Sequence, residues 1–225
     1  MNIKIKIITL LNLLLIVGCS GAAPEPIADD EGAIGNPAVH ENVLLNLWGE
    51  NHTAFGIYVP SSAQGGRAED MQGEKPFALG YSVEAGQQIS ENPLYDFAFL
   101  NLEGRYDGDA VRVIMEGIRS PNAVGRKSVL VRIPSVEEAG IETTAERIAE
   151  IMEAGADGVT IPHVRNLEEA ETVAGLFREL DVDVWSPANP EGEKIAMIML
   201  EDPEAIAQAS QIADVEGISI LACGI

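Results

Sequence analysis

Basic residues are scarce in this chain: 14 lysines and arginines stand against 36 aspartates and glutamates, which gives a formal net charge of −22 over 225 residues. Such an excess of negative charge repels phosphate groups, so it argues against nucleic acids and anionic membrane surfaces as partners. The chain is nevertheless 46% hydrophobic and 22% charged, a balance that permits one large domain with a substantial core.

Lipid attachment is predicted near the N-terminus. Lys4 and Lys6 precede an apolar segment, residues 7–17, which is too short for a comfortable membrane span and is typical of a secretory signal. The segment runs into Ile-Val-Gly-Cys at residues 16–19, which resembles the lipobox of bacterial lipoproteins. That resemblance implies cleavage before Cys19 and lipid attachment to its sulfur; the alternative is an ordinary signal peptide followed by a chance cysteine.

The chain is therefore expected to have three parts. Residues 1–18 are a signal peptide, residues 19–41 are a lipid-anchored flexible tether rich in glycine, alanine, proline and acids, and residues 42–225 are the folded domain. We expect the protein to be exported and anchored to the bacterial cell envelope, facing the periplasm or the exterior. Several acyl chains on one cysteine would anchor the protein durably. We expect this lipid to be its only contact with the membrane.

Cysteine is nearly absent, since Cys19 and Cys223 are the only two in the sequence. With Cys19 lipidated, no intramolecular disulfide can form. Cys223 is therefore expected to be a small buried residue.

Both common nucleotide-binding fingerprints are missing: neither G-x-G-x-x-G nor G-x-x-x-x-G-K-[ST] occurs, which argues against a nucleotide-binding open sheet. What the chain has instead is a regular alternation of apolar runs and helical patterns. Strands are expected at residues 55–59, 96–102, 128–133, 158–161, 195–200 and 217–222. Helices are expected at residues 42–48, 83–90, 109–118, 144–154, 167–180 and 203–213, with a long loop at 60–74.

Repeated strand–helix units predict an α/β fold with a parallel sheet and right-handed crossovers. Two architectures fit this pattern. One is a doubly wound open sheet, and the other is a (β/α)8 TIM-type barrel, which typically needs ~250 residues and eight units.

Charged residues follow four of the expected strands. Glu103, Arg132, His163 and Glu201 lie at the ends of the second, third, fourth and fifth strands. The carboxyl ends of parallel strands share one rim, where α/β enzymes collect their catalytic groups. The competing interpretations are structural. In one, Glu201 and Asp202 cap the next helix and interact with its dipole, and in the other, Arg132 forms a salt bridge to Glu103 or Glu201.

These residue types suit a defined chemistry. Two carboxylates facing one cavity can hold a hard divalent cation such as Mg²⁺. The fork-shaped guanidinium of Arg132 suits a planar carboxylate. His163 could act as a base, as a metal ligand or as a cap for the helix that begins near Asn166.

Several segments together carry a family resemblance. The order NVLLNLWGE, FGIYV, YDFAFLNLE, SVLVRIP, AGADGVTIPHVRNLEEAE, IAMIMLED and IADVEGISILACG resembles the HpcH/HpaI aldolase/citrate lyase family, within the phosphoenolpyruvate/pyruvate barrel superfamily. The resemblance covers residues 42–224, and AGADGVTIPHV is its most specific segment.

The resemblance implies a (β/α)8 TIM-type barrel that uses Mg²⁺ or Mn²⁺ to bind a small 2-oxo acid such as pyruvate or oxaloacetate. The implied activity is that of a carbon–carbon lyase, of aldolase or decarboxylase type, working through an enolate. By motif, Glu201 matches a metal-binding glutamate, Arg132 the arginine that contacts the 2-oxo acid, and Glu103 the acidic residue after strand two. Gly224 falls in a substrate-contacting turn, and a homo-oligomer is compatible with the resemblance.

Three positions depart from the family pattern. Gly104 stands where the aldolases place a histidine base, although Glu153 matches the acid that supports that base. Met199 stands where a glutamine is frequent, and the second metal-binding aspartate would lie beyond Ile225. The barrel is therefore expected to be incomplete after its sixth strand, either because the sequence is a fragment or because the barrel is naturally truncated with an impaired site. We expect a fragment, because a barrel cut after strand six exposes two unpaired sheet edges. The alternative function is a non-catalytic, carboxylate-binding surface lipoprotein on the same fold.

Overall fold

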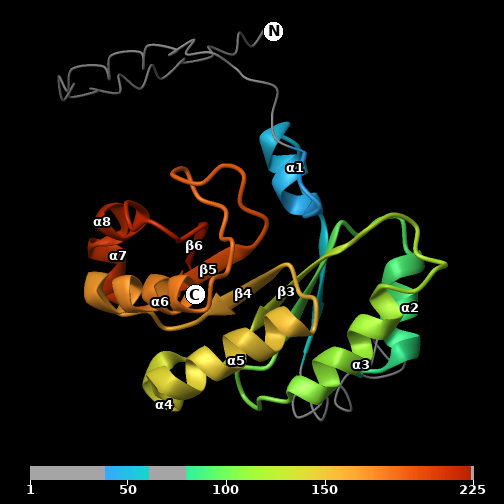
Figure 1. The fold of residues 1–225 in the computed structure, drawn as a ribbon, viewed down its shortest axis with the longest axis horizontal. Coiled ribbons are helices and arrows are strands. Elements are labelled where there is room, and N and C mark those ends of the chain that lie inside the picture. Colours follow the sequence, from blue (N-terminus) through green and yellow to red (C-terminus); the bar gives the residue numbers. More distant parts are fainter. Residues whose placement is uncertain (1–38, 61–79, 224–225) are drawn as a thin grey trace, which may run out of the picture. The chain divides into compact units, whose positions relative to one another are not determined.

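The computed structural model describes residues 39–60 and 80–223, and these contain one six-stranded parallel sheet with helices around it (Figure 1). The elements in chain order are α1 (Val43–Gly49), β1 (Gly56–Val59), α2 (Val83–Glu91), β2 (Phe97–Asn101), α3 (Gly108–Ile118), β3 (Ser128–Arg132), α4 (Val136–Ala139), α5 (Ile141–Glu153), β4 (Gly158–Ile161), α6 (Leu167–Glu179), β5 (Ile195–Leu200), α7 (Pro203–Ala207), α8 (Ala209–Ala213) and β6 (Ile220–Cys223).

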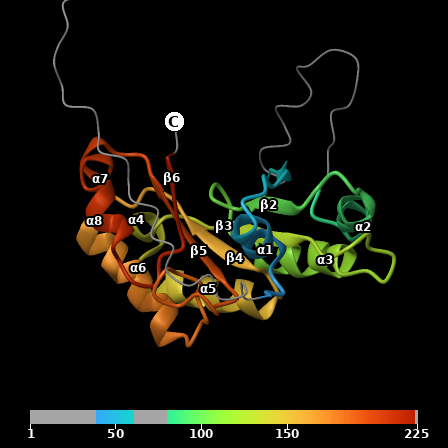
Figure 2. The same cartoon turned by 90° about the horizontal axis from the view of Figure 1, so that it is seen from above.

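The strand order distinguishes the two candidate architectures. The strands lie in the order β1-β2-β3-β4-β5-β6, each parallel to its neighbour. A doubly wound sheet reverses its strand order at a switch point, and no reversal occurs here. Figures 1 and 2 show the sheet curled, with α3, α5 and α6 along its outer side. The α/β class is confirmed, and the described strands are those of a partial TIM-type barrel.

The outer face of the sheet holds the larger core. Alternate strand residues such as Leu100, Val131 and Ile198 are fully buried against the helices. Helices α2 and α3 approach each other through Gly86 and Gly117, where an added Cβ would collide with backbone of the facing helix. Both glycines are therefore required by close helix packing.

The inner face is covered at one end by α1. Leu44 and Leu45 of this helix form a second, smaller cluster with Leu130 and Ile195 from the strands. Trp48 and Trp185 pack against the same cluster. Gly158 leaves room for it, because a Cβ there would collide with Ile195 and Leu130.

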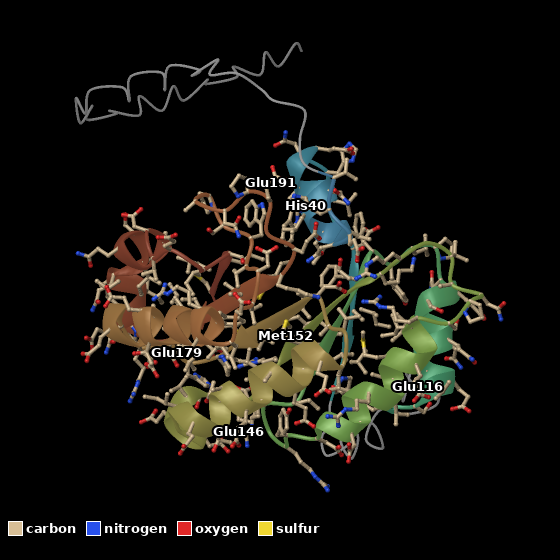
Figure 3. All side chains as sticks on the ribbon, viewed as in Figure 1. His40, Glu116, Glu146, Met152, Glu179 and Glu191 are labelled. Atoms are coloured by element: carbon tan, nitrogen blue, oxygen red, sulfur yellow. The ribbon has the colours of Figure 1, made fainter. Side chains whose placement is uncertain are left out.

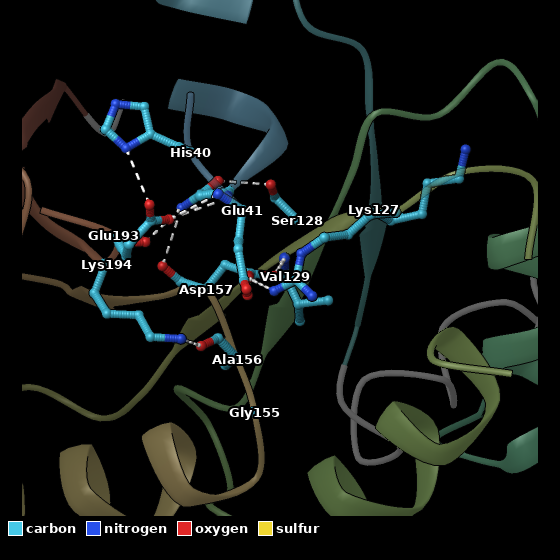
Figure 4. Close-up of polar contacts among 12 residues, drawn as sticks. His40, Glu41, Lys127, Ser128, Val129, Gly155, Ala156, Asp157, Glu193 and Lys194 are labelled. Carbon is cyan, nitrogen blue, oxygen red and sulfur yellow. Dashed lines mark hydrogen bonds and ion pairs between the residues drawn. The ribbon is translucent and has the colours of Figure 1, made fainter. Parts of the chain in front are cut away.

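A network of hydrogen bonds fixes α1 to the amino ends of the strands (Figure 4). Asn42 caps the helix by accepting from the Leu44 amide, and it accepts from the Ser128 hydroxyl at 2.7 Å. Its Nδ2 lies 3.3 Å from the carbonyl oxygens of both Asp157 and Glu193. One side chain therefore joins α1 to the segments that begin β3, β4 and β5.

Asp157 forms the main ion-pair cluster at this end. Its side chain is 2% exposed, and its two carboxylate oxygens accept from Arg126 at 2.6 Å and Arg119 at 2.7 Å. A third bond comes from the Val129 amide at 2.8 Å. We call Asp157, Arg119 and Arg126 the amino-end cluster.

The acidic surplus lies on the outside. Figure 3 labels Glu116, Glu146 and Glu179, which project from α3, α5 and α6, and all three are exposed. Of the helices in the described ranges, none combines the length and apolar character that crossing a bilayer requires.

Several boundaries differ from the expected ones. The helix expected at 144–154 begins earlier, at Ile141, and is preceded by the short α4. The helix expected at 203–213 divides at Gln208 into α7 and α8. The expectation that Cys223 is buried is wrong: it is exposed at the end of β6, which has no second neighbour among the described strands.

Some expectations fall outside the described residues. These are the signal peptide, Cys19, nearly all of the tether, Gly224, and all but the first residue of the expected loop at 60–74.

Candidate functional site

Strand alternation brings the predicted residues to one face of the sheet. Successive side chains in a strand point to opposite faces, so every second residue shares a face. Glu201 follows Ile195, Met197 and Met199 in this alternation, and Ile195 and Met197 belong to the inner-face cluster. In the same way, Glu103 follows Phe97 and Phe99, and Arg132 follows Leu130. All three charged side chains therefore continue the inner face of the curled sheet.

Arg132 lies between the two glutamates. Its Nη2 donates to Glu103 Oε1 at 2.6 Å and to Glu201 Oε2 at 3.4 Å. The side chains of Arg132, Glu103 and Glu201 are 15%, 24% and 17% exposed, so solvent reaches them only in part. The expected salt bridge thus exists, and it joins both glutamates through one guanidinium.

His163 closes the group from the solvent side. Its Nε2 lies 3.1 Å from Glu103 Oε1, its Nδ1 lies 3.1 Å from Glu201 Oε2, and its side chain is 48% exposed. The backbone N–H of His163 also donates to Glu201 Oε2 at 3.1 Å. His163 has φ of 55°, a left-handed conformation that is uncommon for residues other than glycine. We call Glu103, Arg132, His163 and Glu201 the rim cluster.

The rim cluster has unused binding capacity. With a neutral imidazole, two carboxylates and one guanidinium sum to a net charge of −1. The Nε of Arg132 is buried and makes no hydrogen bond within the described residues. A buried donor without an acceptor costs free energy, so it favours a ligand that supplies one.

The donor set fits a divalent cation. Glu103, His163 and Glu201 each offer one ligand atom, and these atoms lie within 4.8 Å of one another. Carboxylate oxygens suit Mg²⁺ and Mn²⁺, and an imidazole nitrogen suits several transition metals. The residues present therefore match the cofactor that the family resemblance implied.

The two competing interpretations of Glu201 and His163 as helix caps are wrong. Asp202 is the N-cap of α7, no side chain caps that helix, and Glu201 instead contacts Arg132 and His163. Helix α6 is capped by Asn166 itself, which accepts from the Glu169 amide at 3.0 Å.

Residues beneath Glu103 support the site, and the sequence analysis did not identify them. Asn101 Oδ1 accepts from the Glu103 amide at 3.2 Å, and its Nδ2 donates to the Tyr58 hydroxyl at 2.6 Å. The Tyr81 hydroxyl lies 3.2 Å from the carbonyl oxygens of both Val59 and Asn101. Burial raises the pKa of Tyr81, so this phenol stays protonated and remains a donor. The polar residue at the end of an apolar strand, Asn101, was the available signal.

The expected pairing of Glu153 with position 104 is not found. Glu153 is exposed in the last turn of α5, which leads into the amino end of β4 at Gly158. Gly104 lies beyond the carboxyl end of β2, so the two positions are at opposite ends of the sheet. A strand of four or five residues spans roughly 13–17 Å, too far for a side-chain contact. Helix α5 must return to the amino ends of the strands because β4 begins there, a constraint of the fold that the sequence motif does not contain.

Comparison with known proteins gives the fold and the family. The family model for HpcH/HpaI aldolase/citrate lyase matches residues 94–225. Among solved structures, an HpcH/HpaI aldolase/citrate lyase family protein from Burkholderia cenocepacia J2315 has a TM-score of 0.56 at 15% identity, over 81% of this chain and 68% of that one. An HpcH/HpaI aldolase from Desulfitobacterium hafniense DCB-2 has a TM-score of 0.55 at 18% identity, over 80% and 65%.

A third similar structure is the citrate synthase SbnG, with a TM-score of 0.53 at 17% identity over 80% of this chain. The chain spans 64% of that structure, less than two thirds of its length. No curated protein sequence matches significantly. At these identities the structural likeness shows the fold, an aldolase/lyase-type barrel, while the family model covers more than half of the chain. The protein belongs to the HpcH/HpaI aldolase/citrate lyase family.

Proposed function

We propose that this protein binds a small 2-oxo acid together with a divalent metal ion and acts as a carbon–carbon lyase of aldolase or decarboxylase type. The observation that supports this most directly is the rim cluster, in which the four side chains lie 2.6–3.4 Å apart around the buried, unpartnered Arg132 Nε. Pyruvate and oxaloacetate are the substrates that the family resemblance implies, and both carry a carboxylate that Arg132 could bind.

Glu201 would hold the metal, and Glu103 lies close enough to supply a second carboxylate oxygen. The ion would supply Lewis-acid polarisation of the 2-oxo group. It would also change the net charge of the site from −1 to +1, which suits an anionic substrate.

Arg132 would bind the substrate itself. A guanidinium binds a carboxylate through two parallel N–H groups, and Arg132 has one such group, Nε, without a partner. Its Nη2 now neutralises Glu103 and Glu201, a role that a bound cation would share. Arg132 would then orient the 2-oxo acid and stabilise the negative charge that develops during bond cleavage.

The test is calorimetry with oxalate or pyruvate in the presence and absence of Mg²⁺ or Mn²⁺. Glu201→Ala should abolish the metal-dependent part of binding, because it removes a ligand oxygen. Arg132→Ala should weaken 2-oxo acid binding without weakening metal binding. Glu179→Ala, on the exposed side of α6, is the matched control and should bind normally. Normal binding by both site variants would refute the assignment.

A second candidate function is non-catalytic capture of a carboxylate on the same fold. The observation that favours it is the missing base: Gly104 carries no side chain, and Glu153 lies at the other end of the sheet. Turnover separates the two functions. Metal-dependent loss of oxaloacetate that is abolished in Glu201→Ala would identify an enzyme, whereas tight binding without turnover would identify a binding protein.

We also propose export and lipid anchoring through Cys19, on the strength of the Ile-Val-Gly-Cys motif behind a basic, apolar leader. Mass spectrometry of the membrane fraction should find an acylated Cys19 as the mature N-terminus. An unmodified N-terminus that begins at another residue would contradict the proposal.

A further inference from the structure

We propose that His163 is itself a metal ligand, and that its nitrogen makes the rim cluster prefer Co²⁺, Ni²⁺ or Zn²⁺ over Mg²⁺. The inference rests on the proposed function only in placing a cation beside Glu103 and Glu201. It assigns to His163 a role that does not depend on which substrate, if any, the protein converts.

The distances around the imidazole are already close to those of a metal site. Each ring nitrogen lies 3.1 Å from a carboxylate oxygen, of Glu103 on one side and of Glu201 on the other. Two ligands that bind one ion at 2.0–2.1 Å lie about 3.3 Å apart in tetrahedral geometry. Either nitrogen–carboxylate pair can therefore share an ion with only a small movement.

The arrangement also orients the ring. A histidine that binds a metal through one nitrogen usually donates from the other to a carboxylate or carbonyl, which fixes the tautomer. Here a carboxylate lies opposite each nitrogen. Because Glu201 is the proposed metal-binding glutamate, Nδ1 would bind the ion beside it and Nε2 would donate its proton to Glu103.

The backbone holds His163 in this position. Its left-handed conformation is stabilised by the amide, which donates to Glu201 Oε2 at 3.1 Å. The next amide, of Val164, donates to the Met199 carbonyl of β5 at 3.1 Å. The imidazole is thus attached to the strand that ends in Glu201, so its place is set by the fold as well as by its own rotamer.

The donor set explains the preference. Mg²⁺ favours oxygen ligands and keeps several waters, whereas imidazole suits zinc, nickel and related ions. Arg132 strengthens this bias, because its Nη2 lies 2.6 Å from Glu103 and already offsets part of the carboxylate charge on which a hard cation depends. The nitrogen bond then contributes a larger share of the affinity.

The experiment measures metal binding by the full chain, stripped of metal, without any substrate. Wild type and His163→Asn are titrated with Zn²⁺, Co²⁺ and Mg²⁺ by calorimetry. Asparagine is chosen because it tolerates the left-handed backbone at this position. His52→Asn is the matched control, since His52 is exposed and paired with Glu50 outside the rim cluster.

His163→Asn should bind Zn²⁺ and Co²⁺ at least ~10-fold more weakly, since loss of a second-shell partner alone costs about that much. Mg²⁺ affinity should change by less than about threefold, because water can replace the imidazole. In the Co²⁺ form, NMR should show a strongly shifted, exchangeable imidazole N–H proton in wild type and His52→Asn, and none in His163→Asn. Unchanged zinc affinity, or a retained N–H signal, would overturn the proposal.

The outcome is separable from that of the proposed function. Zinc binding through His163 without any effect of oxalate or pyruvate would keep this inference and reject the lyase. Metal-dependent oxalate binding that is equal in wild type and His163→Asn would keep the proposed function and reject this inference. If the wild-type protein binds no metal, both are wrong.

Discussion

The two ends of the sheet carry charged clusters of opposite design. At the amino end, a single carboxylate, that of Asp157, receives two guanidinium groups and a backbone amide, and it is almost fully buried. At the carboxyl end, two carboxylates share one guanidinium and one imidazole, and all four side chains are partly exposed. The first cluster has an excess of donors, and the second has an excess of acid together with the unused Arg132 Nε.

The contrast separates stability from chemistry within one sheet. A cluster whose buried carboxylate already accepts three hydrogen bonds leaves no acceptor for a ligand and serves to hold β3 and β4 together. An unsaturated, accessible one gains by taking up a cation and an anion. Barrel proteins generally place stabilising residues at the amino end and reactive ones at the carboxyl end. Stability and binding measured on variants of both ends test this division.

The largest effect is expected at the amino end. Asp157→Ala removes the acceptor of three hydrogen bonds and leaves Arg119 and Arg126 without their shared carboxylate. We expect the free energy of unfolding to fall by about 3 kcal/mol, measured by urea denaturation. Asp214→Ala, an exposed acid on the surface, is the control and should stay within about 0.5 kcal/mol of wild type.

The matched change at the other end is Glu201→Ala, which leaves Arg132 paired with Glu103 at 2.6 Å and should alter stability by less than about 1 kcal/mol. The same variant should abolish metal-dependent binding. If Glu201→Ala were as destabilising as Asp157→Ala, the division between the two ends would not hold.

The next effect concerns Arg132 as a competitor for the cation. Arg132→Gln removes a positive charge that lies 2.6 Å from Glu103, so metal affinity should rise on the order of tenfold. The same variant should bind oxalate more weakly, because the guanidinium that would receive it is gone. Calorimetry measures both, and a loss of metal affinity would show that Arg132 helps to shape the metal site.

Tyr106 offers a smaller, pH-dependent test. Its hydroxyl donates to Glu150 at 2.6 Å, and burial, with Glu150 as the second cause, raises the pKa of Tyr106. The folded state therefore favours the protonated phenol. This contribution is fully present below about pH 10 and is lost as the pH rises further.

We expect Tyr106→Phe to cost about 1 kcal/mol at pH 8. Between pH 9 and 11 the variant should also lose stability less steeply than wild type, as followed by thermal denaturation. A variant whose alkaline profile has the wild-type slope would show that Tyr106 does not contribute to it.

The smallest expected effect is at Gly104. Gly104→His would restore an aldolase-like base only if Glu153 could orient it, and these positions lie at opposite ends of the sheet. We therefore expect little gain in aldol cleavage, although a well-positioned base contributes roughly 10²- to 10⁴-fold.

Oxaloacetate decarboxylation needs no such base, because loss of carbon dioxide leaves the electron pair behind. In wild type it should therefore exceed aldol cleavage, and the ratio of the two rates before and after Gly104→His is the measurement. A large rise in aldol cleavage after the substitution would show that an acid other than Glu153 orients the new histidine.

Much of the fold and the membership of the rim cluster followed from sequence pattern. The runs that end in Glu103, Arg132 and Glu201 are apolar and compact, and period-two alternation places all three on one face. The left-handed turn at His163, which aims both ring nitrogens inward, has no such pattern, because it depends on a bond from its amide to Glu201.

Other features were set by tertiary context. Cys223 is exposed because β6 lies at the edge of the described sheet. An apolar strand has the same sequence pattern at an edge as in the centre of a sheet, so the pattern could not predict this exposure. Asn42 looks like an ordinary helix cap in sequence, whereas in the fold it also bonds three separate segments.

The packing of α1 has a spectroscopic consequence. Trp48 and Trp185 are the only tryptophans in the chain, and both pack against the α1 cluster on the inner face of the sheet. Tryptophan emission therefore reports on whether α1 is packed against the sheet, and it is insensitive to the outer helices. Far-ultraviolet circular dichroism, in contrast, is dominated by those helices. If α1 leaves the sheet before the rest unfolds, the two signals will report different midpoints, and each can be assigned to its own part of the molecule.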